Sequence, residues 1–412
     1  MAERKKHIVR HIRLRSVFNI RGGVMEMDQS RRDFLQAGLV LPAAGFVSAN
    51  FTQSDQKVLP KITYRTLGKT GLKVTGVGYG IGYVPNTEVV NRAIDLGINY
   101  FDTSRDYKES EAIFATCIKG DRRQKVIIST KSGSTEKQEI LDDMNTSLKT
   151  LGTDYVDIWH LHARDMPSRI PDEAIEAMVQ CKKSGKARFI GFSTHNPANM
   201  VDFLLKTNVF DVIQMTYSYA ISAGGFGLRE QAIKKLTDAD IGIIAMKVVV
   251  ALSGMNMGRG DSGQAIQSNM KPGEGPISGI KWVLNNPGVG TTVPNMNSIA
   301  ELEMNIRAMS EPYTAADEQL LFVMNEQIRP DYCRMCYECD GRCPKGMPVT
   351  DALRYLAYYD FMGSLYQATV NFNSLSPEIR KIRCGDCVDC AVKCPNGVSV
   401  KNRLMRAQAL FA

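Results

Sequence analysis

The chain has 412 residues, of which 44% are hydrophobic and 23% are charged, and its formal net charge is +8. This composition excludes a globally disordered protein. The absence of any uninterrupted apolar run of about 18 residues excludes a membrane protein with several spans. The length allows two or three domains, or one barrel-sized domain with an appendage.

Most of the positive charge lies at the start of the chain. Residues 1–32 contain nine Lys or Arg against three acidic residues, a net +6, so the rest of the chain carries only +2. A nucleic-acid-binding face needs basic residues on the folded body, and this distribution does not supply them. We therefore expect no nucleic-acid partner.

Residues 1–49 have the pattern of an export leader. Arg31 and Arg32 precede a short apolar stretch, 37–49, that contains Pro and Gly and ends in small residues. The arginine pair resembles a twin-arginine signal, which implies transient contact with the twin-arginine translocase and a periplasmic or otherwise exported protein. The alternative is a buried N-terminal helix with a chance arginine pair in a cytoplasmic protein. Met25 and Met27 are alternative start residues, and residues 50–61 are expected to be a linker.

Residues 62–312 alternate short β-branched runs with segments of helical period. After a β-hairpin over 64–74, the predicted strands are 77–81, 98–103, 125–130, 155–162, 188–194, 212–217, 242–248 and 290–295. The predicted helices are 86–96, 110–119, 136–151, 171–184, 197–207, 229–239, 277–285 and 298–309. Eight such units predict an α/β fold, a (β/α)₈ TIM barrel. A doubly wound sheet is less favoured because no GxGxxG follows a strand.

Ionisable residues follow the predicted strands at the end where barrel enzymes place their chemistry. Asp102 ends the second strand, Tyr107 follows five residues later, Lys131 ends the third strand and His162 ends the fourth. Each alone has an ordinary structural explanation, such as a turn cap or a buried histidine. Four complementary groups on one rim instead indicate an active site.

The segments 99–107, 126–131, 154–162, 186–193 and 212–217 resemble, in order, the conserved strands of the aldo-keto reductases. The resemblance implies that Tyr107 donates a proton to a substrate carbonyl while a nicotinamide cofactor delivers hydride. Lys131 would lower the pKa of Tyr107, Asp102 would pair with Lys131, and His162 would orient the carbonyl.

The same resemblance places Ser193, Thr194 and Gln214 near the nicotinamide carboxamide and Asn305 near the adenine. Two positions depart from the usual pattern, because Met246 stands where an aromatic ring often stacks on the nicotinamide and Thr194 where Asn is usual. Glu301 stands where NADPH-preferring members often have a basic residue. A carboxylate there repels a 2′-phosphate, so we expect NAD(H) in preference to NADP(H).

Residues 331–412, reached through an expected linking helix over 313–330, contain eight of the ten cysteines in two C-x₂-C-x₂-C-x₃-C-P runs. This is the bacterial ferredoxin pattern, in which the fourth cysteine of each run binds the other [4Fe–4S] cluster. One cluster would take Cys333, Cys336, Cys339 and Cys394, and the other Cys384, Cys387, Cys390 and Cys343. Zinc is less favoured because the ligands of a zinc site usually come as two separated pairs of residues. Disulfides are less favoured because three cysteines this close in sequence pair poorly with one another. A helix is expected over 350–359, and Cys117 and Cys181 are expected to be buried helix residues.

Two functions are compatible with these patterns. The first is an enzyme that transfers hydride between a nicotinamide cofactor and a small carbonyl or alcohol substrate, with two clusters for electron transfer or for structure. The second is an electron-transfer or binding protein that serves a redox partner and uses the barrel as a scaffold. Intact Asp102, Tyr107, Lys131 and His162 favour the first function, whereas the altered cofactor positions favour the second.

Overall fold

The computed structural model describes residues 61–82, 85–224, 227–249 and 273–411. The leader, its arginine pair, the alternative starts and most of the linker lie outside these residues. Eight parallel strands form one sheet in the order β10-β9-β8-β7-β6-β5-β4-β3. Their bounds are β3 Tyr79–Gly80, β4 Tyr100–Asp102, β5 Ile127–Ser132, β6 Val156–Leu161, β7 Ala187–Thr194, β8 Val212–Thr216, β9 Gly242–Met246 and β10 Val289–Thr292.

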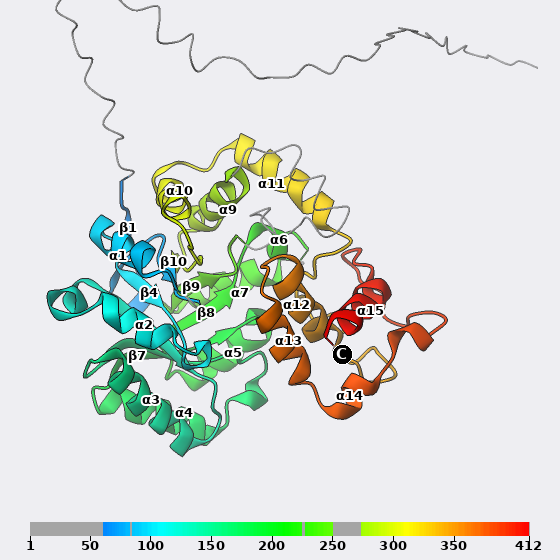
Figure 1. Ribbon diagram of the computed structural model, residues 1–412, viewed down its shortest axis with the longest axis horizontal. Helices are drawn as coiled ribbons and strands as arrows, with labels where there is room; N and C mark the ends of the chain where they lie inside the picture. The colour runs from blue at the N-terminus through cyan, green and yellow to red at the C-terminus, as the bar shows by residue number, and fades with distance from the viewer. Residues whose placement is uncertain (1–60, 83–84, 225–226, 250–272, 412) are drawn as a thin grey trace, which may run out of the picture. The chain divides into compact units, whose positions relative to one another are not determined.

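Isolated parallel bridges close the sheet into a barrel. Val77 pairs with Thr292, and Gly80 pairs with Asn295, so the first strand lies beside the last. Helices surround the strands (Figure 1). Their bounds are α1 Thr87–Leu96, α2 Ser110–Cys117, α3 Lys137–Leu151, α4 Asp172–Lys183, α5 Pro197–Thr207, α7 Leu228–Asp238, α9 Glu274–Asn285 and α10 Ile299–Ser310. The predicted TIM barrel is confirmed.

The predicted hairpin packs against the barrel through its apolar side chains. Strands β1 (Tyr64–Thr66) and β2 (Lys73–Thr75) pair antiparallel around the short 3₁₀ turn Gly68–Thr70. Leu67, fully buried, packs with Ile158, Val212 and Ile244 of the strands. A Cβ on Gly290 would lie 2.7 Å from the Leu67 side chain, so this strand needs glycine where the hairpin approaches.

The C-terminal segment is mostly helical. Helix α11 (Ala315–Ile328) precedes α12 (Val349–Asp360), α13 (Leu365–Asn373), the short α14 (Pro377–Lys381) and α15 (Val400–Phe411). Helices α13 and α15 were not among the predicted elements. Helices α12, α13 and α15 enclose a hydrophobic core that also includes Cys333 and Cys384.

A second, smaller core joins the C-terminal segment to the barrel. The short helix α6 (Tyr219–Ser222) contributes Ile221, which packs with Leu321 and Met324 of α11 and with Phe361 just after α12. Buried Arg334 donates a hydrogen bond to the carbonyl of Ala220 at 2.6 Å. The described residues accordingly belong to one compact unit.

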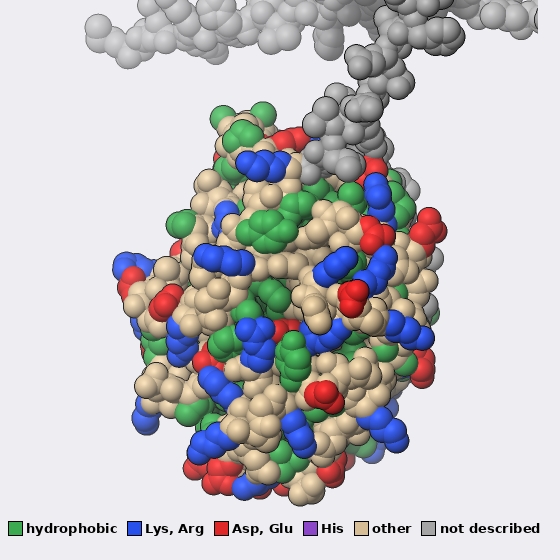
Figure 2. All heavy atoms as spheres, turned by 90° about the vertical axis from the view of Figure 1, so that its left-hand side faces the viewer, with side chains coloured by type: hydrophobic (Ala, Val, Ile, Leu, Met, Phe, Trp, Pro, Cys, Tyr) green, Lys and Arg blue, Asp and Glu red, His purple; other side chains and the backbone are tan. Residues whose placement is uncertain are grey.

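On the face shown in Figure 2, lysine and arginine side chains are spread among acidic and uncharged ones. Among the described residues, no helix is both long and apolar enough to cross a membrane. Cys117 and Cys181 are 2% and 1% exposed on α2 and α4, as predicted, and burial raises the pKa of both thiols, that of Cys181 to about 11.

Candidate active site and candidate cysteine cluster sites

The carboxyl ends of the strands bring a buried ion pair to the middle of the barrel. Lys131 Nζ on β5 lies 2.6 Å from Asp102 Oδ2 at the end of β4 and donates a second hydrogen bond to the carbonyl of Thr103 at 2.7 Å. The lysine is 1% exposed. Burial lowers the pKa of Lys131, and the charge of Asp102 opposes that shift.

Asp102 is fixed by two further donors. Ser129 Oγ donates to Asp102 Oδ1 at 2.8 Å, and Gln214 Nε2, from β8, donates to Asp102 Oδ2 at 2.9 Å. Strands β4, β5 and β8 therefore all contribute to one polar cluster. A carboxylate with three donors around it is rigid, and it holds the lysine ammonium in one place.

Tyr107 ends a short 3₁₀ turn, Arg105–Tyr107, that begins directly after Ser104. The Ser104 hydroxyl accepts a hydrogen bond from the backbone N–H of Asp106 at 3.2 Å, which caps this turn. Lys131 Nζ lies 5.8 Å from the centre of the Tyr107 ring, and the His162 ring packs edge-on at 5.6 Å between centres. The structure thus brings Asp102, Tyr107, Lys131 and His162 together.

His162 has a partner that the sequence analysis missed. Its Nδ1 atom contacts Asp106 Oδ2 and lies 3.3 Å from Ser104 Oγ. Burial acts to raise the pKa of Asp106, but the hydrogen bond and charge of His162 outweigh it and leave that pKa below its usual value. The carboxylate directly before Tyr107 in the sequence was the signal that could have revealed this pair.

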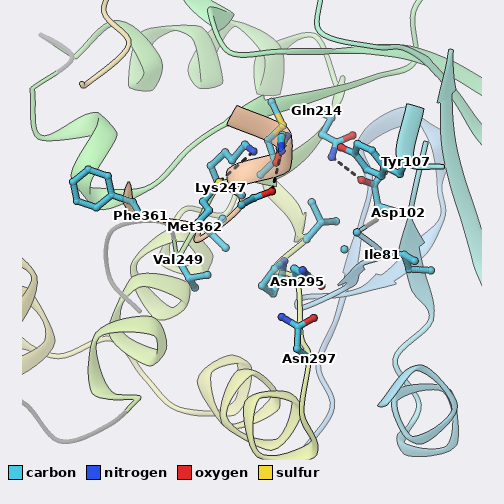
Figure 3. A pocket seen from close by; sticks show the side chains of 18 residues that line it. Ile81, Asp102, Tyr107, Gln214, Lys247, Val249, Asn295, Asn297, Phe361 and Met362 are labelled. Atoms are coloured by element: carbon cyan, nitrogen blue, oxygen red, sulfur yellow. Dashed lines mark hydrogen bonds between the residues drawn. The ribbon is translucent and has the colours of Figure 1, made fainter. Parts of the chain in front are cut away.

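A cavity of about 270 Å³ opens beside these residues (Figure 3). Asp102, Tyr107 and Gln214 line it, whereas His162 and the buried Lys131 do not. Its remaining lining comes from the ends of other barrel strands and from the C-terminal segment. These residues are Gly80, Ile81, Gly82, Met246, Lys247, Val248, Val249, Val293, Pro294, Asn295, Asn297, Phe361, Met362, Ser364 and Gln367.

Of the five predicted cofactor residues, only Gln214 lines this cavity, and its Oε1 is buried without a hydrogen-bond partner. Ser193 Oγ accepts from the backbone N–H of Ala163 at 2.8 Å, and Thr194 donates to Asp165 at 3.1 Å. The other two, Glu301 and Asn305, lie on α10. Glu301 Oε2 accepts from the backbone N–H of Asn297 at 2.6 Å, and Asn305 is buried. Their cofactor contacts stay predictions.

Four cysteines from both sequence runs line a second cavity. These are Cys333, Cys336, Cys339 and Cys394, the set predicted for the first cluster. The loop that carries the first three has left-handed backbone at Met335 (φ 52°) and Tyr337 (φ 61°), which turns the chain between successive cysteines. The sulfur of Cys333 accepts a hydrogen bond from a backbone N–H at 3.4 Å, and that of Cys336 accepts one from the Asn396 amide at 3.5 Å. The sulfur of Cys339 lies 3.2 Å from the Thr350 hydroxyl.

The other four cysteines also lie near one another. Burial and, to a smaller extent, the neighbouring thiols of Cys343, Cys387 and Cys390 together raise the pKa of Cys384 to about 11. All ten cysteines of the chain fall within the described residues, and each is a free thiol. Within these same residues, no three His, Cys, Asp or Glu side chains are placed to share one metal ion.

A buried polar network connects the barrel to α12. Asp165 Oδ1 accepts a hydrogen bond from the backbone N–H of His195 at 2.6 Å. On the α12 side, the His195 ring lies 3.4 Å from both the Arg354 guanidinium and the Tyr358 hydroxyl. His195 and Arg354 are both buried. This network fixes α12 against the barrel rim.

Comparison with known proteins shows what the barrel is similar to. Residues 80–273 match the aldo/keto reductase family. An uncharacterised oxidoreductase of Bacillus subtilis, YqkF, is 32% identical over 168 residues, 36% of this chain and 54% of that protein, so the chain spans about half of that relative's length. L-galactose dehydrogenase of Arabidopsis thaliana is 27% identical over 289 residues, 61% of this chain and 90% of that protein.

A solved structure shares the fold. The holo form of an aldo-keto reductase from Bacillus halodurans superimposes with a TM-score of 0.55 at 24% identity, covering 64% of this chain and 96% of that chain. Its apo form gives a TM-score of 0.52 at 25% identity, again covering 64% and 96%.

Proposed function

Since residues 80–273 match the aldo/keto reductase family, we propose that this chain is an oxidoreductase that transfers hydride between a nicotinamide cofactor and a carbonyl or alcohol substrate. The observation that carries the proposal is the arrangement around Tyr107. Its ring and the carboxylate of Asp102 line one cavity, and Lys131 is buried directly behind them. A proton donor, a fixed cation and a space for substrate are therefore adjacent.

Tyr107 donates its phenolic proton to the substrate oxygen during reduction and takes it back during oxidation. The ammonium of Lys131 favours the phenolate that forms, because a positive charge nearby stabilises an anion. Asp102 keeps that ammonium in place and charged despite its burial. The nicotinamide, when bound, supplies or accepts the hydride.

The cavity has a group suited to a nicotinamide. Gln214 donates its amide N–H to Asp102, which leaves its Oε1 buried and without a partner among the described residues. An unsatisfied acceptor of this kind is costly unless a ligand donates to it. The amide N–H₂ of a nicotinamide is such a donor, so Gln214 would orient the ring.

His162 orients the substrate carbonyl beside Tyr107 in this proposal. Because Asp106 occupies Nδ1, the nitrogen that remains for the substrate is Nε2. A carbonyl oxygen only accepts, so Nε2 must also carry a proton in this contact, which the carboxylate beside Nδ1 favours. The edge-on contact with the Tyr107 ring keeps the two side chains next to each other.

For the cofactor we propose NAD(H) in preference to NADP(H). Glu301 stands in the first turn of α10, and its carboxylate bonds the backbone N–H of Asn297, a residue that lines the cavity. A fixed carboxylate repels a 2′-phosphate and can accept from a ribose hydroxyl. Fluorescence titration with NADH and NADPH tests this, and tighter NADPH binding contradicts it.

The decisive experiment for the proposed reaction is Tyr107→Phe. Loss of a positioned general acid should lower kcat by about 10²–10⁴-fold while cofactor binding stays intact. Tyr64→Phe is a matched control because that tyrosine is 54% exposed on β1 and donates a hydrogen bond to the carbonyl of Gly97, away from the cavity. Unchanged carbonyl reduction by the Tyr107 variant contradicts the mechanism.

We also propose that the C-terminal cysteines bind two [4Fe–4S] clusters, for electron transfer or for structure. The cavity lined by Cys333, Cys336, Cys339 and Cys394 supports the first ligand set. A cubane needs one thiolate on each of four irons, so its ligands surround a cavity and do not converge on one ion position. Iron and sulfide counts on anaerobically purified protein, with mass spectrometry of any retained nucleotide, test clusters and cofactor together.

The second candidate function, an electron-transfer or binding protein that serves a redox partner, is favoured by one observation. Ser193 and Thr194 bond the protein itself and do not line the cavity. Carbonyl reduction that depends on Tyr107 would eliminate this alternative.

Export is proposed from the leader alone. Replacing Arg31 and Arg32 by lysine should retain the protein in the cytoplasm of a host with a twin-arginine route, measured by cell fractionation. Equal export of the variant contradicts this route.

A further inference from the structure

A buried arginine connects the barrel to the loop that carries three of the cysteines. Arg229, in the first turn of α7, is 3% exposed, and its Nη2 atom donates a hydrogen bond to the carbonyl of Met335 at 2.9 Å. The same atom bonds the carbonyl of His195 at 3.4 Å. Met335 stands between Cys333 and Cys336, and its own N–H bonds the sulfur of Cys333. Arg229 therefore contacts the backbone that shapes this cysteine site.

A second buried arginine lines the site itself. We call the cavity of Cys333, Cys336, Cys339 and Cys394 the first cluster site. Arg334 is part of its lining and is 3% exposed. Its guanidinium donates to the carbonyls of Ala220 at 2.6 Å and Asn325 at 3.2 Å. These carbonyls hold the guanidinium in place, but they bring no net negative charge to it.

Neither arginine forms an ion pair with a carboxylate among the residues that the structure describes. The charge of Glu230 acts on the adjacent Arg229, but the two side chains are not paired. By contrast, the buried guanidinium of Arg403 pairs with Asp360. A guanidinium keeps its charge at any ordinary pH, and burying a charge is costly unless an anion compensates it. The first cluster site therefore has two permanent positive charges beside it.

The acidic side chains of the same loop lie in solvent. Glu338 is exposed and pairs with the exposed Arg342 at 3.3 Å. Asp340 is exposed as well. Charges in water are screened by salt, whereas buried charges are screened much less. The two buried arginines therefore contribute more to the electrostatic potential at this site than the exposed acids do.

The second set of cysteines has a different environment. Lys345, Asp386 and Asp389 are all exposed. Lys401 is half-buried and donates a hydrogen bond to the carbonyl of Val388 at 3.3 Å. Val388 stands between two of these cysteines and is 93% exposed. Charges of both signs thus surround this set, and those four charged residues are all in contact with water.

We propose that Arg229 and Arg334 are the buried counter-charges of the [4Fe–4S] cluster at the first cluster site, and that they keep its reduction potential above that of the second cluster. This inference rests on the proposed clusters and adds the cluster on which an electron settles. A cubane held by thiolates is an anion that becomes more negative on reduction, so buried positive charges favour its reduced form. An electron given to either cluster by a one-electron redox partner therefore settles beside the barrel.

The test is a redox titration of the full chain with its clusters loaded, followed by electron paramagnetic resonance. Wild type should show two midpoint potentials. Arg229→Gln keeps a donor for Met335 but removes the charge, so the higher midpoint should fall by about 59 mV or more, a tenfold change in a one-electron equilibrium. The lower midpoint should stay the same. Arg229→Lys keeps the charge and should keep most of the wild-type potential.

Arg342→Gln is the matched control, because it removes the same charge from the same cysteine run but in solvent. Its effect on the higher midpoint should be much smaller than that of Arg229→Gln. Arg334→Gln provides an independent measurement if Arg229→Gln does not fold. Circular dichroism verifies that each variant is folded, and iron and sulfide counts verify that it is loaded.

Four results would overturn the proposal. They are a single midpoint in wild type, an unmoved higher midpoint in both glutamine variants of the buried arginines, a fall of the lower midpoint instead, and equal falls in Arg229→Gln and Arg229→Lys. The last result means that Arg229 only holds the loop in place. Wild-type protein without iron contradicts the proposed clusters, whereas fully loaded protein with unmoved midpoints contradicts this inference alone.

Discussion

The carboxylate of Asp106 is hydrogen-bonded to Nδ1 of His162, although 56 residues separate the two in the chain. Because the carboxylate can only accept, the Nδ1 atom carries the proton, and the ring orientation is fixed relative to the neighbouring Tyr107. The pair joins the turn after β4 to the end of β6. In the proposed reaction, Asp106 thus positions His162 while its chain neighbour Tyr107 donates the proton.

Removing this carboxylate should impair positioning without removing the acid. We expect Asp106→Ala to lower kcat by up to about 100-fold, the lower end of what positioned acid–base groups contribute. Asp106→Asn keeps an accepting oxygen and should lose less. Steady-state kinetics of both variants test this, and equal kcat in Asp106→Ala and wild type would show that His162 needs no support.

The buried pair of Lys131 and Asp102 should dominate local stability. Asp102→Asn leaves an uncompensated buried ammonium and should cost about 3–5 kcal/mol of the free energy of unfolding. Adding Lys131→Met should recover part of that loss, so the two changes are not additive. Asp95→Asn, which breaks a pair with Arg122 in which the aspartate is 52% exposed, should cost at most about 1 kcal/mol. Urea denaturation of Asp102→Asn, Lys131→Met, their combination and Asp95→Asn measures these losses, and additivity of the first two would contradict a coupled pair.

His160 makes stability depend on pH. It lies on β6, fully buried, with both ring nitrogens lacking a partner among the described residues, and burial together with the charge of Lys131 lowers its pKa to about 3. In the unfolded chain it takes up a proton near pH 6.5. Unfolding is therefore favoured as the pH falls from about 6.5 towards 3, by up to about 1.4 kcal/mol per pH unit. Chemical denaturation measures the free energy of unfolding at pH 7 and at pH 5. The difference between these two values should be smaller for His160→Gln than for wild type, and an equal difference would contradict this account.

Gly191 should tolerate no side chain. A Cβ there would lie 2.3 Å from the backbone oxygen of Val212 on the adjacent strand, which cannot move without disturbing the sheet. We expect Gly191→Ala to cost about 3 kcal/mol or more. Gly82→Ala is the comparison, because its nearest neighbour is the Asn295 side chain at 3.2 Å, which can rotate away. Thermal unfolding measures the stability that each variant loses relative to wild type. A larger loss of stability in Gly82→Ala than in Gly191→Ala would contradict this prediction.

The pairing of cysteines between the two runs can be tested directly. Cys394→Ser should disturb the cluster that we propose at Cys333, Cys336 and Cys339, since all four cysteines line one cavity. Cys343→Ser should disturb the other cluster, next to Cys384. Iron counts and electron paramagnetic resonance of the reduced variants separate the cases. If Cys343→Ser instead removes the cluster at Cys336, each run binds its own cluster.

The sequence was sufficient to predict the barrel because each strand is a short apolar run followed by a helix with clear start and stop residues. It also placed Asp102, Tyr107, Lys131 and His162 correctly on one rim, since parallel strands end at the same side. Contacts across the fold were not predictable. The approach of Met362 to Lys247 joins residues 115 positions apart, and no local pattern encodes it. The Thr194 hydroxyl donates to buried Asp165, a contact that a strand-end pattern alone does not reveal; its predicted place at the cofactor stays a prediction.

Helix α12 borders both cavities. Thr350, in its first turn, contacts the sulfur of Cys339, and Phe361 directly after its last residue lines the cavity of Tyr107. A shortened protein ending at residue 312 would therefore not be a minimal catalyst. It would lack the C-terminal residues that line the cavity beside Tyr107, and it would expose the apolar side of α6 to water. The two parts of this unit should therefore be expressed and engineered together.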